Sequence, residues 1–331
     1  MRPPIRSLPL ATSPARGEVT LVRVLLLALA LTFSSGPALA LEKLTVMLDW
    51  FVNPDHGPII VAQQMGYFAA AGLEVTIIAP SDANDPPKLV AAGRADLAIS
   101  YQPQLYLLVA EGLPLKRVGT LVATPLNSLV VLADGPIKSI ADLKGKRIGF
   151  SVAGFEETML SAMLKKHGLT LRDVQLVNVN FALTAAMLSG QVQGVIGAFR
   201  NFELTELEQL GKAGRAFLPE EHGVPAYDEL IVVAHKDKTN DPRIRAFLNA
   251  IELGVQYMHN HPNEAWAAFV RHDRDLDDAL NKRAWADTLP RFAHSPAAFD
   301  RARYERFAQF LVQEGLIKQA LPVEQYAVEV R

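Results

Sequence analysis

The 331-residue chain contains no cysteine. That absence excludes disulfide bonds, zinc sites built on thiolates, a cysteine nucleophile and a lipid anchor on an N-terminal cysteine. The chain also lacks an excess of basic residues, and its net charge of −2 does not suit a protein that coats nucleic acid or an anionic membrane. Its composition, 50% hydrophobic and 21% charged, is that of a globular protein long enough for two domains.

The first 40 residues have the pattern of an export signal. Four arginines precede the apolar run VLLLALALTF, which is followed by the small-residue segment GPALA. Ala38 and Ala40 fit an A-x-A cleavage site, so we expect residues 1–40 to be a signal peptide cleaved near Ala40. The apolar run is about half of the ~20 residues that a membrane span needs. We therefore expect a mature protein without a membrane span, free in the periplasm.

From Leu41 onward, short apolar runs alternate with longer segments of helical periodicity. This alternation predicts an α/β fold with mostly parallel sheets. One such unit spans about 44–127, and a similar unit spans about 134–228. From Asp241 the pattern favours helices alone. The predicted organisation is two α/β units followed by a helical part.

If the helical part packs against the first unit, the chain crosses between two lobes twice. The crossings fall near 125–135 and near 224–232 and would form a two-strand hinge beside a cleft. We therefore expect a two-lobed clamp, with residues 41–127 and 232–331 in lobe 1 and residues 128–231 in lobe 2.

The stretch LDWFVNPDHGPIIVAQQMGYF, residues 48–68, follows the first predicted strand. Ligands in open α/β sheets bind outside the carboxyl ends of strands, so this loop is expected to face the cleft. Trp50 can stack on a flat heterocycle. The amide of Asn53 offers a donor and an acceptor, although Asn-Pro also favours a turn. Asp49 can hold an amine or fix its own loop.

His56 in the same loop has three candidate roles: ligand contact, general base and metal ligand. No histidine stands three or four residues further on, and Asp49 and Asp55 form no known metal-ligand spacing. No nucleophile or orienting partner accompanies the imidazole. A structural or ligand-binding role is therefore favoured, and we predict neither a catalytic nor a metal-binding residue.

Polar and aromatic residues also follow later strands. Tyr101 comes after the third predicted strand, and Gly154 precedes a helix whose first turn holds Glu156 and Glu157. Free N–H groups at that helix start can hold a polar ligand, but acids there also stabilise a helix without any ligand. The sequence lacks the glycine spacing of a phosphate-binding loop and the Gly-x-Ser-x-Gly of a nucleophile elbow, and we expect no cofactor.

Four segments together resemble a known family: LDWFVNPDHGPIIVAQQMGYFAAAGLEVTIIAP, KLVAAGRADLAISYQPQL, SIADLKGKRIGFS and GAFRNFELTELEQLG. They are similar to substrate-binding proteins of ABC importers in the thiamine-pyrimidine-synthesis-like family (NMT1/THI5-like, SsuA-like), above all to those for formylaminopyrimidine. The resemblance covers about residues 41–320. It implies a type II periplasmic binding protein fold, a monomer, and delivery of a small-molecule ligand to a permease.

The resemblance also implies roles for residues of the second unit. One of Glu156 and Glu157 can pair with the edge of an aminopyrimidine through charge-assisted hydrogen bonds. Asn201 and Glu203 match family positions, with helix capping as the alternative role, and Tyr227 at the second crossing is a further candidate.

Three other functions compete with pyrimidine binding. The first is binding of another small solute, such as an aliphatic sulfonate, taurine, nitrate or riboflavin, but the predicted acids disfavour anions. The second is pyrimidine synthesis, but the related synthases carry a Cys-rich motif that is absent here and usually a proline where this chain has Val52. The third is a periplasmic sensor or adaptor without a transported ligand.

Overall fold

The computed structural model describes residues 40–330. The predicted signal peptide lies outside these residues except for Ala40. From Leu41 onward the chain forms one compact unit. Among the described residues, the helices are too short or too polar to cross a membrane.

The first sheet contains β1 (Glu42–Met47), β2 (Leu73–Ile78), β3 (Leu97–Ser100), β4 (Leu115–Val122) and β10 (Leu230–His235). The strand order is β2-β1-β3-β10-β4. β1 pairs in parallel with β2 and β3, whereas β10 runs antiparallel between β3 and β4. β3 (LAIS) is buried along its whole length, and its near-continuous apolar run is typical of a strand covered on both faces.

The second sheet repeats this topology. It contains β5 (Asn127–Leu132), β6 (Arg147–Phe150), β7 (Gln175–Asn178), β8 (Gly194–Phe199) and β9 (Gly214–Phe217). The strand order is β7-β6-β8-β5-β9, with β5 antiparallel between β8 and β9. Each sheet therefore takes in one antiparallel strand that lies far along the chain from a neighbour in the sheet. The expected α/β class is confirmed, although the sheets are mixed rather than purely parallel.

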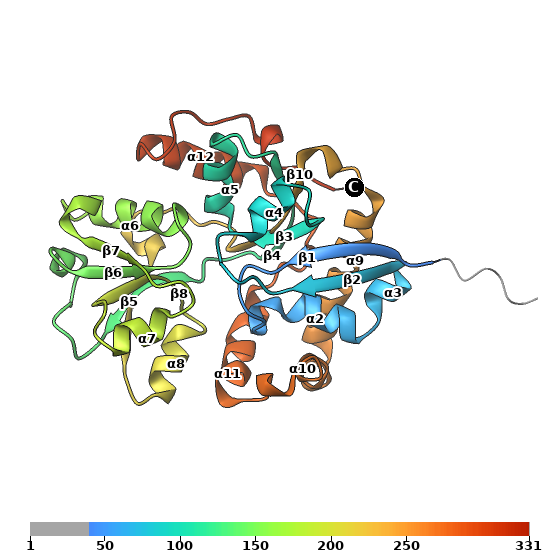
Figure 1. Cartoon of the computed structure of the whole chain (residues 1–331), viewed down its shortest axis with the longest axis horizontal. Coiled ribbons are helices and arrows are strands. Elements are labelled where there is room, and N and C mark those ends of the chain that lie inside the picture. Colours follow the sequence, from blue (N-terminus) through green and yellow to red (C-terminus); the bar gives the residue numbers. More distant parts are fainter. Residues whose placement is uncertain (1–39, 331) are drawn as a thin grey trace, which may run out of the picture. The chain divides into compact units, whose positions relative to one another are not determined.

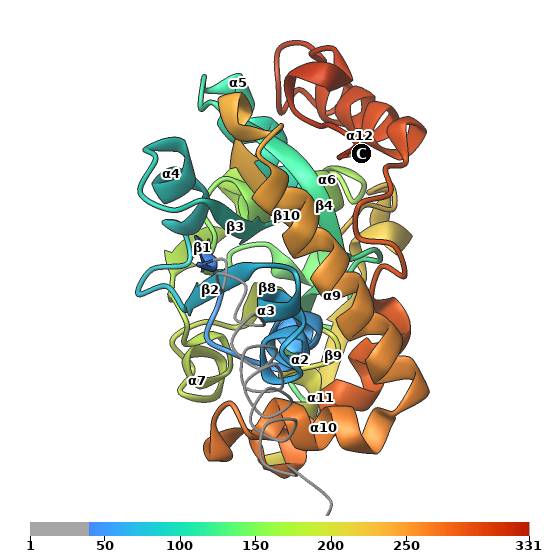
Figure 2. The same ribbon diagram turned by 90° about the vertical axis from the view of Figure 1, so that its right-hand side faces the viewer.

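Helices cover both sheets. Those next to the first sheet are α2 (Gly57–Gln64), α3 (Tyr67–Ala70), α4 (Pro86–Ala91) and α5 (Gln102–Ala110). Those of the second sheet are α6 (Phe155–Lys165), α7 (Leu183–Leu188) and α8 (Glu203–Gln209). The helical end of the chain holds α9 (Pro242–Asn260), α10 (Pro262–Val270), α11 (Ala279–Thr288) and α12 (Arg301–Gln313). Figure 2 shows the long helix α9 crossing beside α2 and α3, which it contacts.

Short 3₁₀ helices complete the described chain. They are η1 (Pro54–His56), η2 (Ile140–Leu143), η3 (Leu171–Asp173), η4 (Pro219–His222), η5 (Lys236–Lys238), η6 (Arg274–Leu276), η7 (Leu289–Arg291) and η8 (Val323–Gln325). The helical segment that follows η1 is divided between α2 and α3. Gly66 has φ of 75° at the division, a conformation that ends a right-handed helix.

The chain passes between the sheets twice. The first crossing segment, residues 123–126, links β4 to β5, and the second crossing segment, residues 218–229, links β9 to β10. Figure 1 shows the first sheet, with β1 to β4 in blue to green and β10 in gold, next to the green-to-yellow second sheet, and these segments run between them. Neither crossing segment belongs to a strand, so the links between the sheets are loops and a 3₁₀ turn rather than paired strands.

Candidate functional site

A cavity of about 450 Å³, including its open mouth, lies where the carboxyl ends of strands from both sheets meet. From the side of the first sheet it is lined by Asp49, Trp50, Asn53, Asp55 and Tyr101. From the side of the second sheet it is lined by Glu156, Leu183, Gly197, Phe199, Phe202 and Glu203. Both halves of the polypeptide thus contribute to one site.

Asp49 lies two residues after the end of β1 and is held from two sides. The Tyr101 hydroxyl donates to its Oδ2 at 2.7 Å, and Nε2 of His56 lies 2.9 Å from its Oδ1. The other imidazole nitrogen, Nδ1, accepts the backbone N–H of Asn53 at 3.3 Å. Because Nδ1 accepts, the proton is on Nε2, which donates to Asp49. His56 is therefore a positioning residue for this carboxylate.

Asn53 begins the 3₁₀ turn that carries these residues. Its Oδ1 accepts the backbone N–H of Asp55 at 2.8 Å, and its Nδ2 donates to the Phe51 carbonyl at 3.3 Å. This is the capping role that Asn-Pro sequences favour. The amide also lines the cavity.

Asp55 lies 2% exposed and connects three elements. Its Oδ1 accepts Nδ2 of Asn201 at 2.7 Å and the hydroxyl of Thr288 at 2.9 Å. Asn201 follows β8 of the second sheet, and Thr288 ends α11. Burial raises the pKa of Asp55 to about 6, although these hydrogen bonds oppose the shift. The Asp55–Asn201 bond directly joins the two halves of the site.

Glu156 enters the cavity from the first turn of α6, where its Oε2 accepts the backbone N–H of Ser151 at 2.7 Å. Burial raises the pKa of this carboxyl well above its usual range. The neighbouring strand leaves room for it at Gly197, which sits at a register shift between β5 and β8. Gly197 has φ of 97°, and a Cβ there would meet the Glu156 carboxylate at 2.3 Å. Only glycine satisfies both conditions.

Glu203 opens α8, and its Oε2 accepts the backbone N–H of Phe199 at 2.6 Å. Burial raises the pKa of Glu203 to about 8. Four acidic residues line this cavity: Asp49, Asp55, Glu156 and Glu203. No lysine, arginine or histidine lines it. Within residues 40–330, no three or more His, Asp or Glu side chains are grouped so as to hold a metal ion.

Aromatic rings from both sheets meet at the site. Trp50 contacts Phe181 edge-on, with ring centroids 4.5 Å apart. Tyr101 stacks on Phe155 at 4.9 Å with an interplanar angle of 19°. Phe51, which is 43% exposed, lies 6.1 Å from Phe202. These contacts surround the carboxyls with apolar rings, which accounts for the strong effect of burial on their pKa values.

Comparison with known proteins identifies the family of this chain. The sequence pattern of the family described as NMT1/THI5 like matches residues 53–265. The chain belongs to the NMT1/THI5-like family. A protein of Haemophilus influenzae whose name refers to thiamine biosynthesis is 55% identical over 89% of this chain and 94% of its own length. The formylaminopyrimidine-binding protein of Halalkalibacterium halodurans is 36% identical over 81% of this chain and 82% of its own.

The NMT1/THI5-like family also contains enzymes. The 4-amino-5-hydroxymethyl-2-methylpyrimidine phosphate synthase of Uromyces fabae is 30% identical over 73% of this chain and 74% of its own length. Among solved structures, the alkanesulfonate-binding protein of Xanthomonas axonopodis superposes with a TM-score of 0.68 at 17% identity, covering 87% of this chain and 98% of that one. At that identity the superposition establishes the periplasmic binding protein fold and nothing about the ligand.

Six of the predicted site residues line the cavity: Asp49, Trp50, Asn53, Tyr101, Glu156 and Glu203. The other five lie elsewhere: His56, Gly154, Glu157, Asn201 and Tyr227. His56 and Asn201 lie behind the cavity wall and hold the lining residues Asp49 and Asp55. Tyr227 donates to Glu229 at 3.0 Å in the second crossing segment.

Five lining residues were absent from the predicted set: Asp55, Leu183, Gly197, Phe199 and Phe202. Asp55 lies in a segment whose composition is that of any turn, so its sequence position alone did not show that it lines the cavity. Gly197 lies within an apolar run, where a glycine signals a bulge or a close approach of another group. That signal was available in the sequence GVIGAF.

Proposed function

We propose that the protein is a periplasmic solute-binding protein of an ABC importer, which captures a thiamine-related pyrimidine precursor between two lobes. The observation that carries the proposal is the cavity lining, in which carboxyls and aromatic rings from both sheets are the functional groups. No bond is made or broken in this account.

The carboxyls match the edge of an aminopyrimidine. A carboxylic acid that keeps its proton has one O–H donor and one carbonyl acceptor. The ring nitrogen and adjacent amine of an aminopyrimidine offer the complementary acceptor and donor. Because burial raises the pKa of Glu203 to about 8, this carboxyl holds a proton at neutral pH in the ligand-free protein. Burial raises the pKa of Glu156 as well. A neutral base is therefore bound by paired hydrogen bonds, and a cationic one by the ionised carboxylates.

The acidic lining argues against the anionic solutes. A sulfonate or a nitrate ion would meet four carboxyl groups and no basic side chain in the cavity. Desolvation of an anion beside these groups would cost free energy without a compensating charge. Riboflavin carries no such charge, so the lining chemistry does not exclude it.

The lining also favours binding over synthesis. No histidine lines the cavity. His56 is fully buried, and both of its ring nitrogens are already hydrogen-bonded. The side chains that line the cavity include no lysine and no nucleophilic serine.

The two lobes of the proposal are residues 41–127 with 232–331, and residues 128–231. The ligand would shift an equilibrium between open and closed forms because both lobes contact it. The Asp55–Asn201 hydrogen bond and the ring contacts across the site would form on closure. The closed monomer would deliver its cargo to a membrane permease.

A thermal-shift screen of the chain from Leu41 onward tests the proposal. The probes are formylaminopyrimidine, 4-amino-5-hydroxymethyl-2-methylpyrimidine, thiamine, riboflavin, taurine and nitrate. A ligand present at about 100 times its dissociation constant stabilises the native protein by about 2.7 kcal/mol. We expect stabilisation by a pyrimidine. Stabilisation by taurine or nitrate alone would reject the proposed ligand class.

A further inference from the structure

We propose that two arginines, Arg303 and Arg200, position the hinge by clamping both crossing segments, one arginine from each lobe. Each guanidinium donates to a backbone carbonyl in, or directly after, the first crossing segment. The same guanidinium also donates to a carboxylate of the second crossing segment. The inference rests on the proposed closure of the lobes and adds to it the residues that define the pivot.

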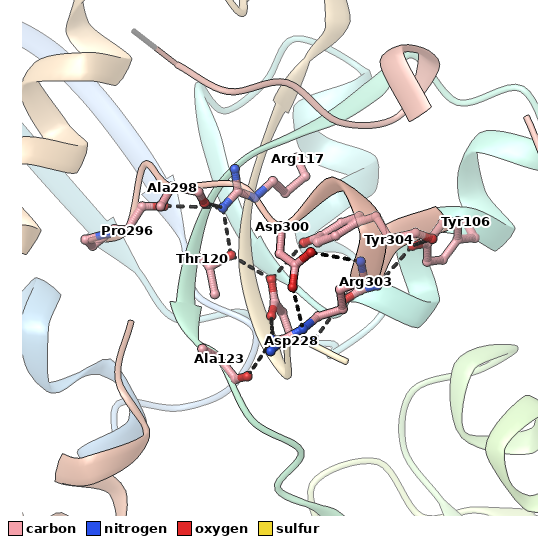
Figure 3. Close-up of polar contacts among 11 residues, drawn as sticks. Tyr106, Arg117, Thr120, Ala123, Asp228, Pro296, Ala298, Asp300, Arg303 and Tyr304 are labelled. Atoms are coloured by element: carbon pink, nitrogen blue, oxygen red, sulfur yellow. Dashed lines mark hydrogen bonds and ion pairs between the residues drawn. The ribbon is translucent and has the colours of Figure 1, made fainter. Parts of the chain in front are cut away.

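Arg303 acts from the side of the first sheet. It lies in the first turn of α12, and its Nη1 donates to the carbonyl of Ala123 at 2.8 Å and to Oδ1 of Asp228. Figure 3 shows the Arg303 side chain between these two partners. One side chain thus holds the start of the first crossing segment against the end of the second.

Asp228 is anchored to the first lobe. Its Oδ2 accepts the hydroxyls of Thr120 at 2.8 Å and Tyr304 at 3.1 Å, and its backbone N–H donates to Gln102 Oε1 at 2.7 Å. These partners lie in β4, α12 and α5. Arg117, which is fully buried, donates in turn to the Thr120 hydroxyl at 2.8 Å (Figure 3). The carboxylate is therefore fixed to three elements of one lobe.

Arg200 makes the matching bridge from the second sheet. It follows β8, and its guanidinium donates to the carbonyls of Leu126 at 3.2 Å and Asn127 at 2.9 Å. The same group forms a bidentate pair with Glu220, at 2.6 and 3.1 Å. Glu220 lies in η4, within the second crossing segment. A bidentate guanidinium–carboxylate pair fixes orientation as well as distance.

The two clamps leave a short interval free to pivot. In the first crossing, the interval lies between Ala123 and Leu126, and in the second it lies between Glu220 and Asp228. Gly223 in the second interval has φ of 99°. Hinges are a few residues that absorb changes of φ and ψ, and the clamps would confine those changes to this interval.

Glu229 joins the crossings at the edge of this interval. Its Oε2 accepts the backbone N–H groups of Leu126 at 2.5 Å and Asn127 at 2.8 Å, and the Tyr227 hydroxyl at 3.0 Å. This carboxylate keeps the two segments adjacent, while the arginines connect them to their respective lobes. Rotation about one axis is the motion that such an arrangement permits.

The test measures lobe motion in the ligand-free full chain. Because the chain has no cysteine, two engineered cysteines can carry spin labels without interference. Leu188 on α7 and Leu253 on α9 are exposed, at 37% and 48%, and belong to different proposed lobes. Pulsed electron spin resonance then gives the distribution of label distances.

Paired variants keep the test independent of unfolding. Arg303→Leu with Asp228→Asn, and Arg200→Leu with Glu220→Gln, remove both charges of each pair, so that no unpaired charge is left buried. Arg301→Ala is the control, since Arg301 lies on the same helix and pairs with exposed Glu305 and Glu324 outside the hinge. Circular dichroism establishes that each protein is folded.

We expect both paired variants to broaden the distance distribution at least twofold relative to Arg301→Ala. A pivot that reaches the closed geometry a tenth as often would also weaken the apparent affinity for a pyrimidine about tenfold. Distributions as narrow as the control's would overturn the clamp even if a pyrimidine binds. Broadened distributions in a protein that binds no pyrimidine would support the clamp and reject the proposed ligand instead.

Discussion

At the scale of single residues, the site is built from carboxyl groups whose positions are fixed before any ligand arrives. Asp49 is held by Tyr101 and His56, and Asp55 by Asn201 and Thr288. Preorganised groups lose little entropy when a ligand binds. The price of this arrangement is the burial of several acids, which raises the pKa values of Asp55, Glu156 and Glu203.

The buried carboxyl of Glu203 predicts a pH-dependent stability. Its pKa is raised from 4.5 to about 8, so the native protein binds a proton that the unfolded chain releases between these values. The free energy of unfolding therefore falls as pH rises from about 5 to 8. We expect Glu203→Gln to flatten this fall, measured by thermal melting without ligand at a series of pH values. Parallel pH profiles of the variant and the parent would contradict the prediction.

Trp50 is predicted to stack on the ligand. Trp50→Leu keeps an apolar side chain but removes the aromatic face, which is worth about 0.5–1.5 kcal/mol beyond the buried area. We expect affinity for a pyrimidine to fall about two- to tenfold, whereas Trp50→Phe retains most of it. Calorimetric titration of both variants provides the measurement. Equal affinities of the two variants would show that stacking is not the role of this ring.

At the scale of elements, the bulge at Gly197 admits Glu156 to the cavity. Gly197→Ala would bring a Cβ to 2.3 Å from the Glu156 carboxylate in addition to the strain of a φ of 97°. Gly190→Ala is a matched control, because its φ of 75° is also unfavourable but its Cβ meets no atom within 4 Å. We expect the control to lose about 1–2 kcal/mol of unfolding free energy and Gly197→Ala to lose clearly more. Chemical denaturation of both variants decides the point, and equal losses would contradict it.

Asn201, in the loop before α8, is hydrogen-bonded to Asp55 in the turn η1. Asn201→Asp replaces its donor to Asp55 by a second carboxyl, and two adjacent carboxyls repel each other when both are ionised. Because the pKa of Asp55 is raised to about 6, we expect pyrimidine affinity to fall more steeply above that pH than below it. Asn201→Ser, which retains a hydroxyl donor, serves as the control. A loss of affinity that does not depend on pH would show that Asn201 does not act through Asp55.

Most of the elements could be predicted from the sequence, because apolar runs and helical periodicity are local signals. β9 is an exception, since its four residues GRAF carry too little pattern to indicate a strand. The partners of Asp55 could not be predicted either. Asn201 lies 146 residues away and Thr288 lies 233 residues away, and no local pattern encodes such contacts. Glu156 and Glu157 were indistinguishable in sequence until the helix direction placed only Glu156 at the cavity.

At the scale of the whole molecule, two sheets of the same topology share one cavity and are linked by two crossing segments. The repeated insertion of one antiparallel strand, β10 in one sheet and β5 in the other, is what requires the chain to cross twice. A ligand that contacts both halves is therefore coupled to their relative movement. The clamps formed by Arg303 and Arg200 belong to this scale, because they act on the movement rather than on the ligand.

The measurement that tests the central claim most directly is a calorimetric titration of the protein with 4-amino-5-hydroxymethyl-2-methylpyrimidine, formylaminopyrimidine and taurine. The account predicts saturable one-to-one binding of at least one pyrimidine, weakened by Glu156→Gln or Glu203→Gln, and no binding of taurine. Tight binding of taurine together with no heat from either pyrimidine would contradict it.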